Sequence, residues 1–271
     1  MRHFKTRTNM IDPNFSEEFL NESKALTPEI YKDLAKPAVQ EVGSVAGRTV
    51  KALLSPIRGM LWGWEQIEKI VEEGVKERFE KIPDDRKKSP NPEIAVPLIQ
   101  ALSYTAQNET LREMYINLLS NSMDLNMDKI VHPSFVEIIK QLNSLDAKVF
   151  DKISETKFYQ KILNPIIRVK DKGQFFTGAT PEWYIGWSIE GFNEFDISAS
   201  LIRLSKFGLI ELMYDRTSSK DGYDNLRSTP YLKNILENYK SAHPNIELEI
   251  AGTESLTYVN EYGNQFRKAC K

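Results

Sequence analysis

Apolar side chains recur every three or four residues through much of the chain before residue 155, a spacing that places them on one face of an α-helix. Asn108 precedes one such stretch, and asparagine in that place typically caps a helix. Pro133 suits the first turn of another helix, because an N–H there would have no partner. The expected helices are 93–107, 109–123 and 133–142, followed by a helix that Ser144 caps.

The longest apolar stripe follows residues 28–81, which begin with Thr27 and Pro28, a typical helix start. Pro37 and Pro56 interrupt the pattern, so we expect kinks or breaks there. Between residues 41 and 69 the polar side chains fall within about 120° of an ideal helix, and apolar side chains fill the opposite side. The candidate contact residues on the apolar face are Leu53, Ile57, Leu61 and Trp64.

Three interpretations of the stripe over residues 39–64 stay open. Packing on the protein's own core or on a second subunit is the default for such helices, and we favour it. Arg48, Lys51 and Arg58 on the polar side also fit a helix that lies on a membrane surface. The third interpretation is an exposed regulatory arm. The expected partners are therefore a protein or a second copy of the chain, with a membrane surface as the alternative.

After residue 155, short β-branched and aromatic runs alternate with turn residues, which is typical of strands. The expected strands are 166–169, 209–213 and a hairpin of 246–250 and 255–259 around the turn Ala251-Gly252-Thr253. A helix over residues 197–206 is expected to stop at Gly208, and Asn260 to cap the last helix. Residues 215–225 are predicted to be a polar loop and residues 231–241 a helix.

This order of helix, strand, hairpin and helix resembles a winged-helix domain. In that family the helix corresponding to 197–206 often lies in the DNA major groove. Here that helix offers only Arg203 and Lys206 as candidate nucleic-acid contacts, which is little charge for neutralising phosphates. We favour a winged helix that contacts protein or acts as a structural cap, and we keep nucleic-acid binding by this C-terminal domain as the alternative.

The predicted fold is mainly α: long amphipathic helices and a helical bundle, followed by a winged-helix-like α+β domain. The predicted divisions are a flexible arm (1–27), long amphipathic helices (28–88), a helical bundle (92–142) and the winged-helix-like domain (143–271). Ser89-Pro90-Asn91-Pro92 has the composition of a linker and marks the boundary within the helical part.

Composition narrows the classes of function. With 41% hydrophobic and 27% charged residues the chain can bury a core, and a net charge of -2 gives no overall attraction to nucleic acid or anionic lipid. One cysteine cannot form an internal disulfide, which favours a reducing compartment. The first 25 residues lack the apolar core of a secretory signal. We expect a cytoplasmic protein, with peripheral attachment to the inner membrane through residues 39–64 as a variant.

The sequence contains histidine, cysteine and serine residues, but not at the spacings typical of catalytic or metal-binding sites. The sequence has no glycine-rich phosphate loop, no His/Cys metal spacing and no serine nucleophile elbow, so no catalytic residue, metal or cofactor is predicted. His132 stands before Pro133 and is interpreted as a helix cap. Cys270 has no nearby base to activate its thiol, so we treat it as incidental.

Other polar and aromatic groups have structural interpretations. Asn121, Ser122 and Asp124 are expected to end a helix rather than bind a ligand. The tryptophans and tyrosine at 183, 184 and 187 could stack on a base, but core packing is the favoured interpretation. The paired carboxylates at 72–73 and 84–85 lie in mixed-charge stretches typical of a solvated surface.

Three segments, in order, resemble the abortive infection alpha (Abi-alpha) family. They are YKDLAKPAVQEVG (31–43), HPSFVEIIKQLNSLDAKVF (132–150) and SLIRLSKFGLIEL with YGNQFRKAC near the C-terminus. The similarity covers about residues 28–271, and HPSF is its most specific part. The insertion over residues 215–244 departs from the simplest family pattern.

The resemblance implies a role in bacterial defence against phage, in which an infected cell stops growing or dies before the phage spreads. It carries over no catalytic residue. We expect a non-enzymatic defence protein that acts through protein contact, or through a membrane. A winged-helix DNA-binding regulator is the second hypothesis. An enzyme with an unrecognised nuclease or nucleotide-hydrolase site is the third.

Overall fold

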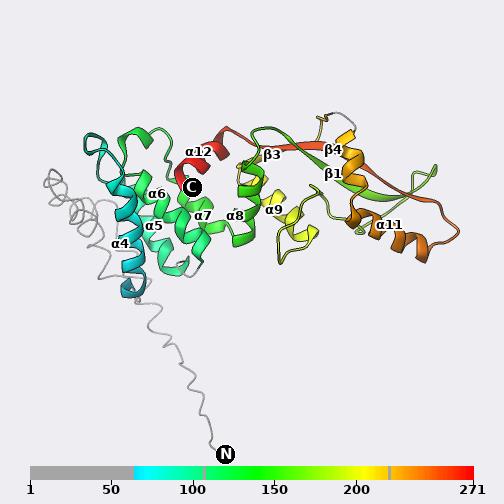
Figure 1. Ribbon diagram of the computed structural model, residues 1–271, viewed down its shortest axis with the longest axis horizontal. Helices are drawn as coiled ribbons and strands as arrows, with labels where there is room; N and C mark the ends of the chain where they lie inside the picture. The colour runs from blue at the N-terminus through cyan, green and yellow to red at the C-terminus, as the bar shows by residue number, and fades with distance from the viewer. Residues whose placement is uncertain (1–63, 106–107, 219–220) are drawn as a thin grey trace, which may run out of the picture. The chain divides into compact units, whose positions relative to one another are not determined.

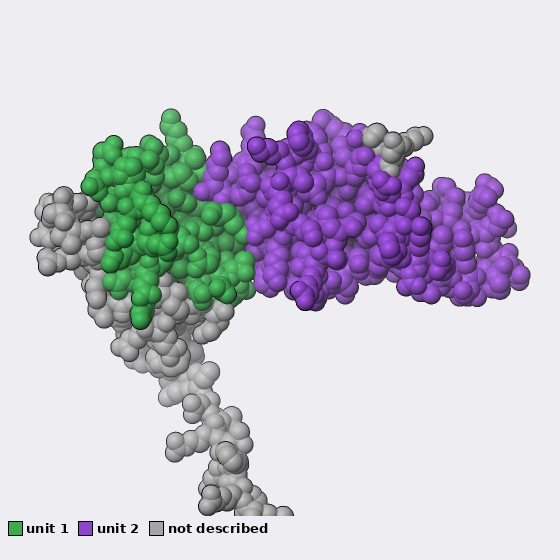
Figure 2. Space-filling model, in the orientation of Figure 1, with its two compact units in different colours: residues 1–140, 269–271 green, residues 141–268 purple. Residues whose placement is uncertain are grey.

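The computed structural model describes residues 64–105, 108–218 and 221–271 (Figure 1). The chain divides into two compact units, which Figure 2 colours separately. Unit 1 comprises residues 1–140 and 269–271, and unit 2 comprises residues 141–268. The expected helix start at Thr27 and the breaks at Pro37 and Pro56 lie outside the described residues. The finer divisions predicted from the sequence stay predictions.

The described part of unit 1 is helical. Its core contains Leu98, Tyr115 and Phe135, whose side chains are fully buried. Its helical elements are α4 (Trp64–Glu80), η1 (Asp84–Arg86), α5 (Pro92–Thr105), α6 (Glu109–Asn121), η2 (Leu125–Met127) and α7 (Ser134–Gln141), the last residue of which falls in unit 2.

The helix ends in unit 1 follow the local signals in the sequence. Asn108 caps α6 as predicted, because its side chain accepts the N–H of Leu111 at 3.2 Å. Helix α6 ends at Asn121, with Ser122 as its C-cap, as expected. His132 precedes α7, and its ring Nδ1 accepts the N–H of Ser134 at 3.2 Å, which confirms the capping interpretation.

Unit 2 begins with α8 (Ser144–Ser154) and contains a sheet with all neighbouring strands antiparallel. Its four strands within the described residues run in the order β2-β1-β4-β3. They are β1 (Gln160–Val169), β2 (Phe175–Phe176), β3 (Ile210–Met213) and β4 (Leu248–Val259). Figure 1 shows β1 and β4 side by side, and their pairing extends from Gln160 opposite Thr257 to Val169 opposite Leu248.

The predicted hairpin at residues 246–259 is wrong, because residues 248–259 form one continuous strand, β4. The residue taken for a turn, Gly252, lies in mid-strand opposite Pro165, with a φ of 140°. A Cβ at this position would lie 2.0 Å from the carbonyl oxygen of Asn164. Glycine is therefore required here by the close approach of two backbones rather than by a chain reversal.

Two helices lie between β3 and β4. They are α10 (Asp221–Arg227) and α11 (Pro230–Ala242). The helix α11 was predicted, but α10 falls largely in a stretch predicted to be loop. Leu232 of α11 packs with Leu163 of β1 and the buried Tyr184. Further along α11, Leu236 and Tyr239 pack against a cluster formed by Ile167, Val169 and Leu248. Helix α11 therefore covers β1 and β4 through ordinary apolar packing.

Two further helices end or begin at the residues predicted from the sequence. Helix α9 (Glu194–Lys206) stops before Gly208, which has a φ of 72°. Helix α12 (Glu261–Cys270) starts after Asn260, whose side-chain oxygen accepts the N–H of Gly263 at 2.9 Å. One predicted cap is wrong, because Asn143 rather than Ser144 caps α8. The described fold is thus a mixed structure of helices and an antiparallel sheet.

Candidate ligand-binding site

The loop between α8 and β1 forms one wall of a pocket in unit 2. Gln160 Nε2 ties the loop back on itself by donating to the carbonyl of Ile153 at 3.1 Å and to the hydroxyl of Thr156 at 2.8 Å. The loop therefore stays short and bent, and its two aromatic residues do not reach the core. Phe158 is 80% exposed and Tyr159 is 55% exposed.

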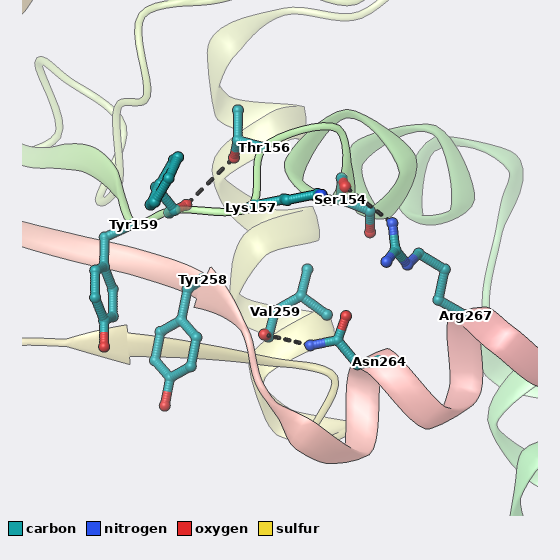
Figure 3. Close-up of a pocket in the computed structure, with 9 residues that line it drawn as sticks. Ser154, Thr156, Lys157, Tyr159, Tyr258, Val259, Asn264 and Arg267 are labelled. Carbon is teal, nitrogen blue, oxygen red and sulfur yellow. Dashed lines mark hydrogen bonds between the residues drawn. The ribbon is translucent and has the colours of Figure 1, made fainter. Parts of the chain in front are cut away.

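The opposite wall comes from the end of β4 and from α12. Asn264 Nδ2 donates to the carbonyls of Val259 at 3.1 Å and Asn260 at 3.0 Å, which holds the first turn of α12 against the end of the strand. About one turn later, Arg267 Nη1 donates to the carbonyl of Ser154 at 3.1 Å. The bond satisfies a carbonyl at the C-terminus of α8 and orients the guanidinium of Arg267 (Figure 3).

These walls form a pocket of about 360 Å³, within the size range of small-molecule sites. Two cationic side chains, Lys157 and Arg267, line it, and no carboxylate does. In Figure 3 the cations lie toward one end of the pocket, and Tyr159 and Tyr258 toward the other. The lining residues are Ser154, Thr156, Lys157, Phe158, Tyr159, Tyr258, Val259, Asn264 and Arg267.

Tyr159 and Tyr258 form the aromatic end. Their ring centroids are 4.9 Å apart and the rings meet edge to face, at 67°. The Tyr258 hydroxyl donates to Glu211 Oε2 at 2.7 Å. This hydrogen bond to a carboxylate, together with burial, raises the pKa of Tyr258 to about 12. The hydroxyl of Tyr258 is thus held by Glu211, and its ring remains as surface at this end of the pocket.

The chemistry of this lining is that of a binding site. A lysine and an arginine attract an anion, and exposed aromatic rings stack on flat groups. The hydroxyl of Ser154 donates to the carbonyl of Phe150 at 2.6 Å, and among the described lining residues no imidazole or carboxylate is present to activate it. The lining thus offers positive charge to an anion and ring surface to a flat group.

A second polar centre of unit 2 is the fully buried Asp146 in the first turn of α8. Its carboxylate accepts hydrogen bonds from the Asn143 backbone at 3.1 Å, the Ser200 hydroxyl at 2.7 Å and Arg203 Nη2 at 2.7 Å. Arg203 Nε adds a contact of 3.0 Å, so the guanidinium binds the carboxylate through two nitrogens. This cluster joins α8 to α9 and satisfies a charge that would otherwise be costly to bury.

The two predicted nucleic-acid contacts therefore have different surroundings. Arg203 directs its guanidinium to Asp146 within unit 2, whereas Lys206, at the end of the same helix, is exposed. The first turn of α9 adds two carboxylates, Glu194 and Asp196. Nucleic-acid contact by Arg203 and Lys206 stays a prediction.

The predicted partner face lies outside the described residues. This holds for Leu53, Ile57 and Leu61, and for the side chain of Trp64, whose backbone begins α4. Within the described ranges, no helix combines the length and the apolar character needed to cross a bilayer. In the same ranges, no group of three or more His, Cys, Asp and Glu side chains is placed to hold a metal ion.

Several residues considered as ligand contacts in the sequence are buried or engaged by neighbouring side chains. Trp183 and Tyr184 are buried, which agrees with the core interpretation, while Lys152 lies over the half-buried Trp187 ring at 5.0 Å. Cys270 is buried, and this burial raises the pKa of its thiol well above the ordinary value. Asp124 pairs with Arg86 and caps η2.

Sequence reasoning did not predict the pocket. Its two walls lie about a hundred residues apart in the chain, so no local spacing brings Lys157 and Arg267 into one pattern. One signal was present: Lys157-Phe158-Tyr159 places a cation and two aromatic residues directly after an amphipathic helix.

The comparisons with known proteins place the chain in a family. The profile of the family described as "Abortive infection alpha" matches residues 63–270, which covers all of unit 2 and the described helices of unit 1. Neither the curated proteins nor the solved structures gave a significant match. Because the family profile spans most of the sequence, the chain belongs to the abortive infection alpha family, whose name points to a role related to abortive infection.

Proposed function

We propose that this chain is a non-enzymatic anti-phage defence protein that acts in abortive infection by binding partners. The observation that carries the proposal is the family match over residues 63–270. The exposed aromatic residues and the two cations of the pocket in unit 2 support action by contact, because aromatic and arginine side chains are enriched where proteins bind partners.

Unit 2 would act as a winged-helix-like module in this proposal. Strands β1, β4 and β3 are neighbours in that order, and α9 precedes β3, as the helix of a winged-helix domain precedes its second strand. Helices α10 and α11 are then an insertion between the wing strands. The pairing of Arg203 with Asp146 supports protein contact over DNA contact, because it engages one of only two basic residues near the end of α9.

DNA binding is the second candidate, because a helix that precedes a strand as α9 precedes β3 lies in the DNA major groove in many winged-helix domains. Its test is duplex binding at low salt with Lys206→Ala, matched with Lys172→Ala on the β1–β2 turn. If α9 is a recognition helix, we expect salt-sensitive binding to the duplex. Lys206→Ala should weaken this binding and Lys172→Ala should leave it unchanged. Absence of binding at low salt removes this candidate.

Residues 39–64 would supply the effector surface of the defence protein. We propose that this segment contacts a protein partner or a second copy of the chain, in a cytoplasmic protein, with attachment to a membrane surface as the variant. Leu53→Glu with Leu61→Glu tests the surface, and Ser55→Glu on the polar side is the matched control. Vesicle co-sedimentation and light scattering then distinguish membrane attachment from self-association.

The defence role itself is tested by phage challenge of a bacterial host that expresses the chain. Cells are infected at low and at high multiplicity, and plaque counts, culture density and cell survival are recorded. Abortive infection predicts that the culture survives at low multiplicity and that infected cells die at high multiplicity without releasing phage. A premature stop codon provides the control. Equal plaque counts with and without the intact chain, over a broad panel of phages, would refute the proposal.

A further inference from the structure

We propose that the pocket between the α8–β1 loop and α12 binds a mononucleotide, with its phosphate at the Lys157 and Arg267 end and its base at the aromatic end. The inference rests on the pocket and does not depend on the proposed defence role. The pocket has three chemically distinct parts: a cationic end, an aromatic end and a hydrogen-bond acceptor. A nucleotide is a ligand that uses all three.

The cationic end fits a phosphate. Within the described ranges neither Lys157 nor Arg267 forms an ion pair, so their charges are not neutralised by a neighbouring carboxylate. The bond from Arg267 Nη1 to the Ser154 carbonyl orients the guanidinium and leaves its Nε and Nη2 donors for a ligand. An oriented guanidinium next to a lysine is a common way for proteins to hold phosphate oxygens.

The aromatic end fits a flat ring. Phe158 is 80% exposed and Tyr159 55%, although neighbouring loop residues are held by hydrogen bonds. Stacking on a base would cover part of this apolar surface. The ring of Tyr258 stands next to Tyr159 and adds surface for stacking, while the Glu211 carboxylate bound to its hydroxyl favours placing the phosphate at the opposite, cationic end.

The acceptor is the side-chain oxygen of Asn264. Its Nδ2 donates to two backbone carbonyls, which determines the orientation of the amide, and no described group donates to its Oδ1. In Figure 3 this oxygen points away from the bond to Val259. It can accept a hydrogen bond from a sugar hydroxyl or from the amino group of a base.

Simpler ligands leave part of the pocket unused. Inorganic phosphate would contact the cations only, and a nucleoside would leave the cations without an anion. A divalent cation would find no carboxylate in the lining. A volume of about 360 Å³ lies near the lower end of the range for small-molecule sites and matches a mononucleotide better than a longer strand.

Calorimetric titration of the full chain with AMP, GMP, CMP and UMP tests the inference, with adenosine and inorganic phosphate as partial ligands. We expect at least one mononucleotide to bind with a Kd below about 1 mM and at least tenfold more tightly than adenosine or phosphate. If no mononucleotide binds, or if phosphate alone binds as tightly, the assignment is overturned. A single-stranded RNA of ten nucleotides is titrated as well. If it binds more tightly than any mononucleotide, the assignment is overturned and the site is a groove for nucleic acid.

Paired variants locate the binding. Lys157→Ala and Phe158→Ala remove exposed side chains of the pocket, and Lys172→Ala and Phe175→Ala remove exposed side chains elsewhere in unit 2. Thermal unfolding confirms that each variant is folded. Each pocket variant should weaken mononucleotide binding about tenfold or more, and each control should leave it unchanged. Equal affinities for pocket and control variants would place the ligand elsewhere and overturn the assignment.

Discussion

The two units of the protein contain the same arrangement, in which an aspartate caps the start of a helix and also pairs with an arginine. In unit 1 Asp124 accepts the N–H of Asn126 at the start of η2 and pairs with Arg86, 38 residues earlier. In unit 2 Asp146 accepts a backbone N–H at the start of α8 and pairs with Arg203, 57 residues later. In both units, therefore, the carboxylate that caps a helix also binds an arginine from a distant part of the chain.

The two pairs differ in exposure to water. The Asp146 side chain is 0% exposed and the Asp124 side chain 9%, while both arginines remain partly accessible. A carboxylate that retains contact with water is partly solvated when its partner is removed, and a fully buried carboxylate is not. The difference teaches that the same pair of residue types can be a modest or a major stabilising contact, depending on burial.

The largest expected effect is that of Arg203→Ala. It leaves the buried Asp146 with the Ser200 hydroxyl and a backbone N–H as its partners, so unfolding of unit 2 should become easier by about 3 kcal/mol. Urea unfolding followed by circular dichroism measures the change. The control is Lys206→Ala on the same helix, which should cost less than about 0.5 kcal/mol. A cost for Arg203→Ala as small as that of Lys206→Ala would contradict the assigned role of the cluster.

The helix caps provide the next comparison. Asn143 forms a reciprocal capping box with Asp146, with a 2.8 Å bond to the Asp146 N–H, while Asn108 makes a single 3.2 Å bond to Leu111. Asn143→Ala should cost about 1.5 kcal/mol and Asn108→Ala about 1 kcal/mol. Replacement by serine at either site retains a capping oxygen and should recover most of the loss. An equal cost for alanine and serine would show that the cap is not the cause.

Arg86→Ala should cost about 1 kcal/mol, less than the equivalent change at Arg203, because Asp124 keeps its bond to Asn126 and some contact with water. Urea unfolding followed by circular dichroism measures both costs, and the smaller cost is expected for Arg86→Ala. A cost for Arg86→Ala equal to or larger than that for Arg203→Ala would contradict the role assigned to burial.

The smallest expected effect is the pH dependence of the Arg86 pair. Burial alone would raise the pKa of Asp124, but hydrogen bonds from Arg86 and Asn126 and the charges of Arg86 and Lys88 outweigh it and lower the pKa. A lowered folded-state pKa means stability that is present above the ordinary aspartate value of about 4 and lost as the pH falls through the folded-state value. The cost of Arg86→Ala, measured by urea unfolding, should therefore shrink in acid. A cost independent of pH down to about 3 would contradict this origin.

Local features could be predicted from the sequence, because each depends on neighbouring residues. Asn108, Asn260 and Gly208 mark helix ends through bonds or backbone angles within a few positions, and the structure confirms all three. The helical periodicity likewise placed α5, α6 and α7 within two residues of their observed ends. Such signals require no knowledge of the rest of the fold.

Features made by distant segments could not be predicted. Gly252 resembles a turn residue, and only its pairing with the segment at Asn164 shows that a close backbone approach requires it. In the same way Arg203 resembles a DNA contact until Asp146 is placed beside it. The pocket at Lys157 and Arg267 joins residues more than a hundred positions apart, and no periodicity extends that far.

The last residues of the chain bear on the order in which the protein folds. Asn121 Nδ2 donates to the carbonyl of Ala269 at 2.9 Å, and Asn117 Nδ2 to that of Cys270 at 3.2 Å, all within unit 1. Proteins leave the ribosome from the N-terminus, and an early domain commonly folds before later ones are made. Unit 1 cannot complete these contacts until every residue of unit 2 has been translated. Until then the amides of Asn117 and Asn121 lack these two partners, an interval in which a chaperone or another protein can bind the helices.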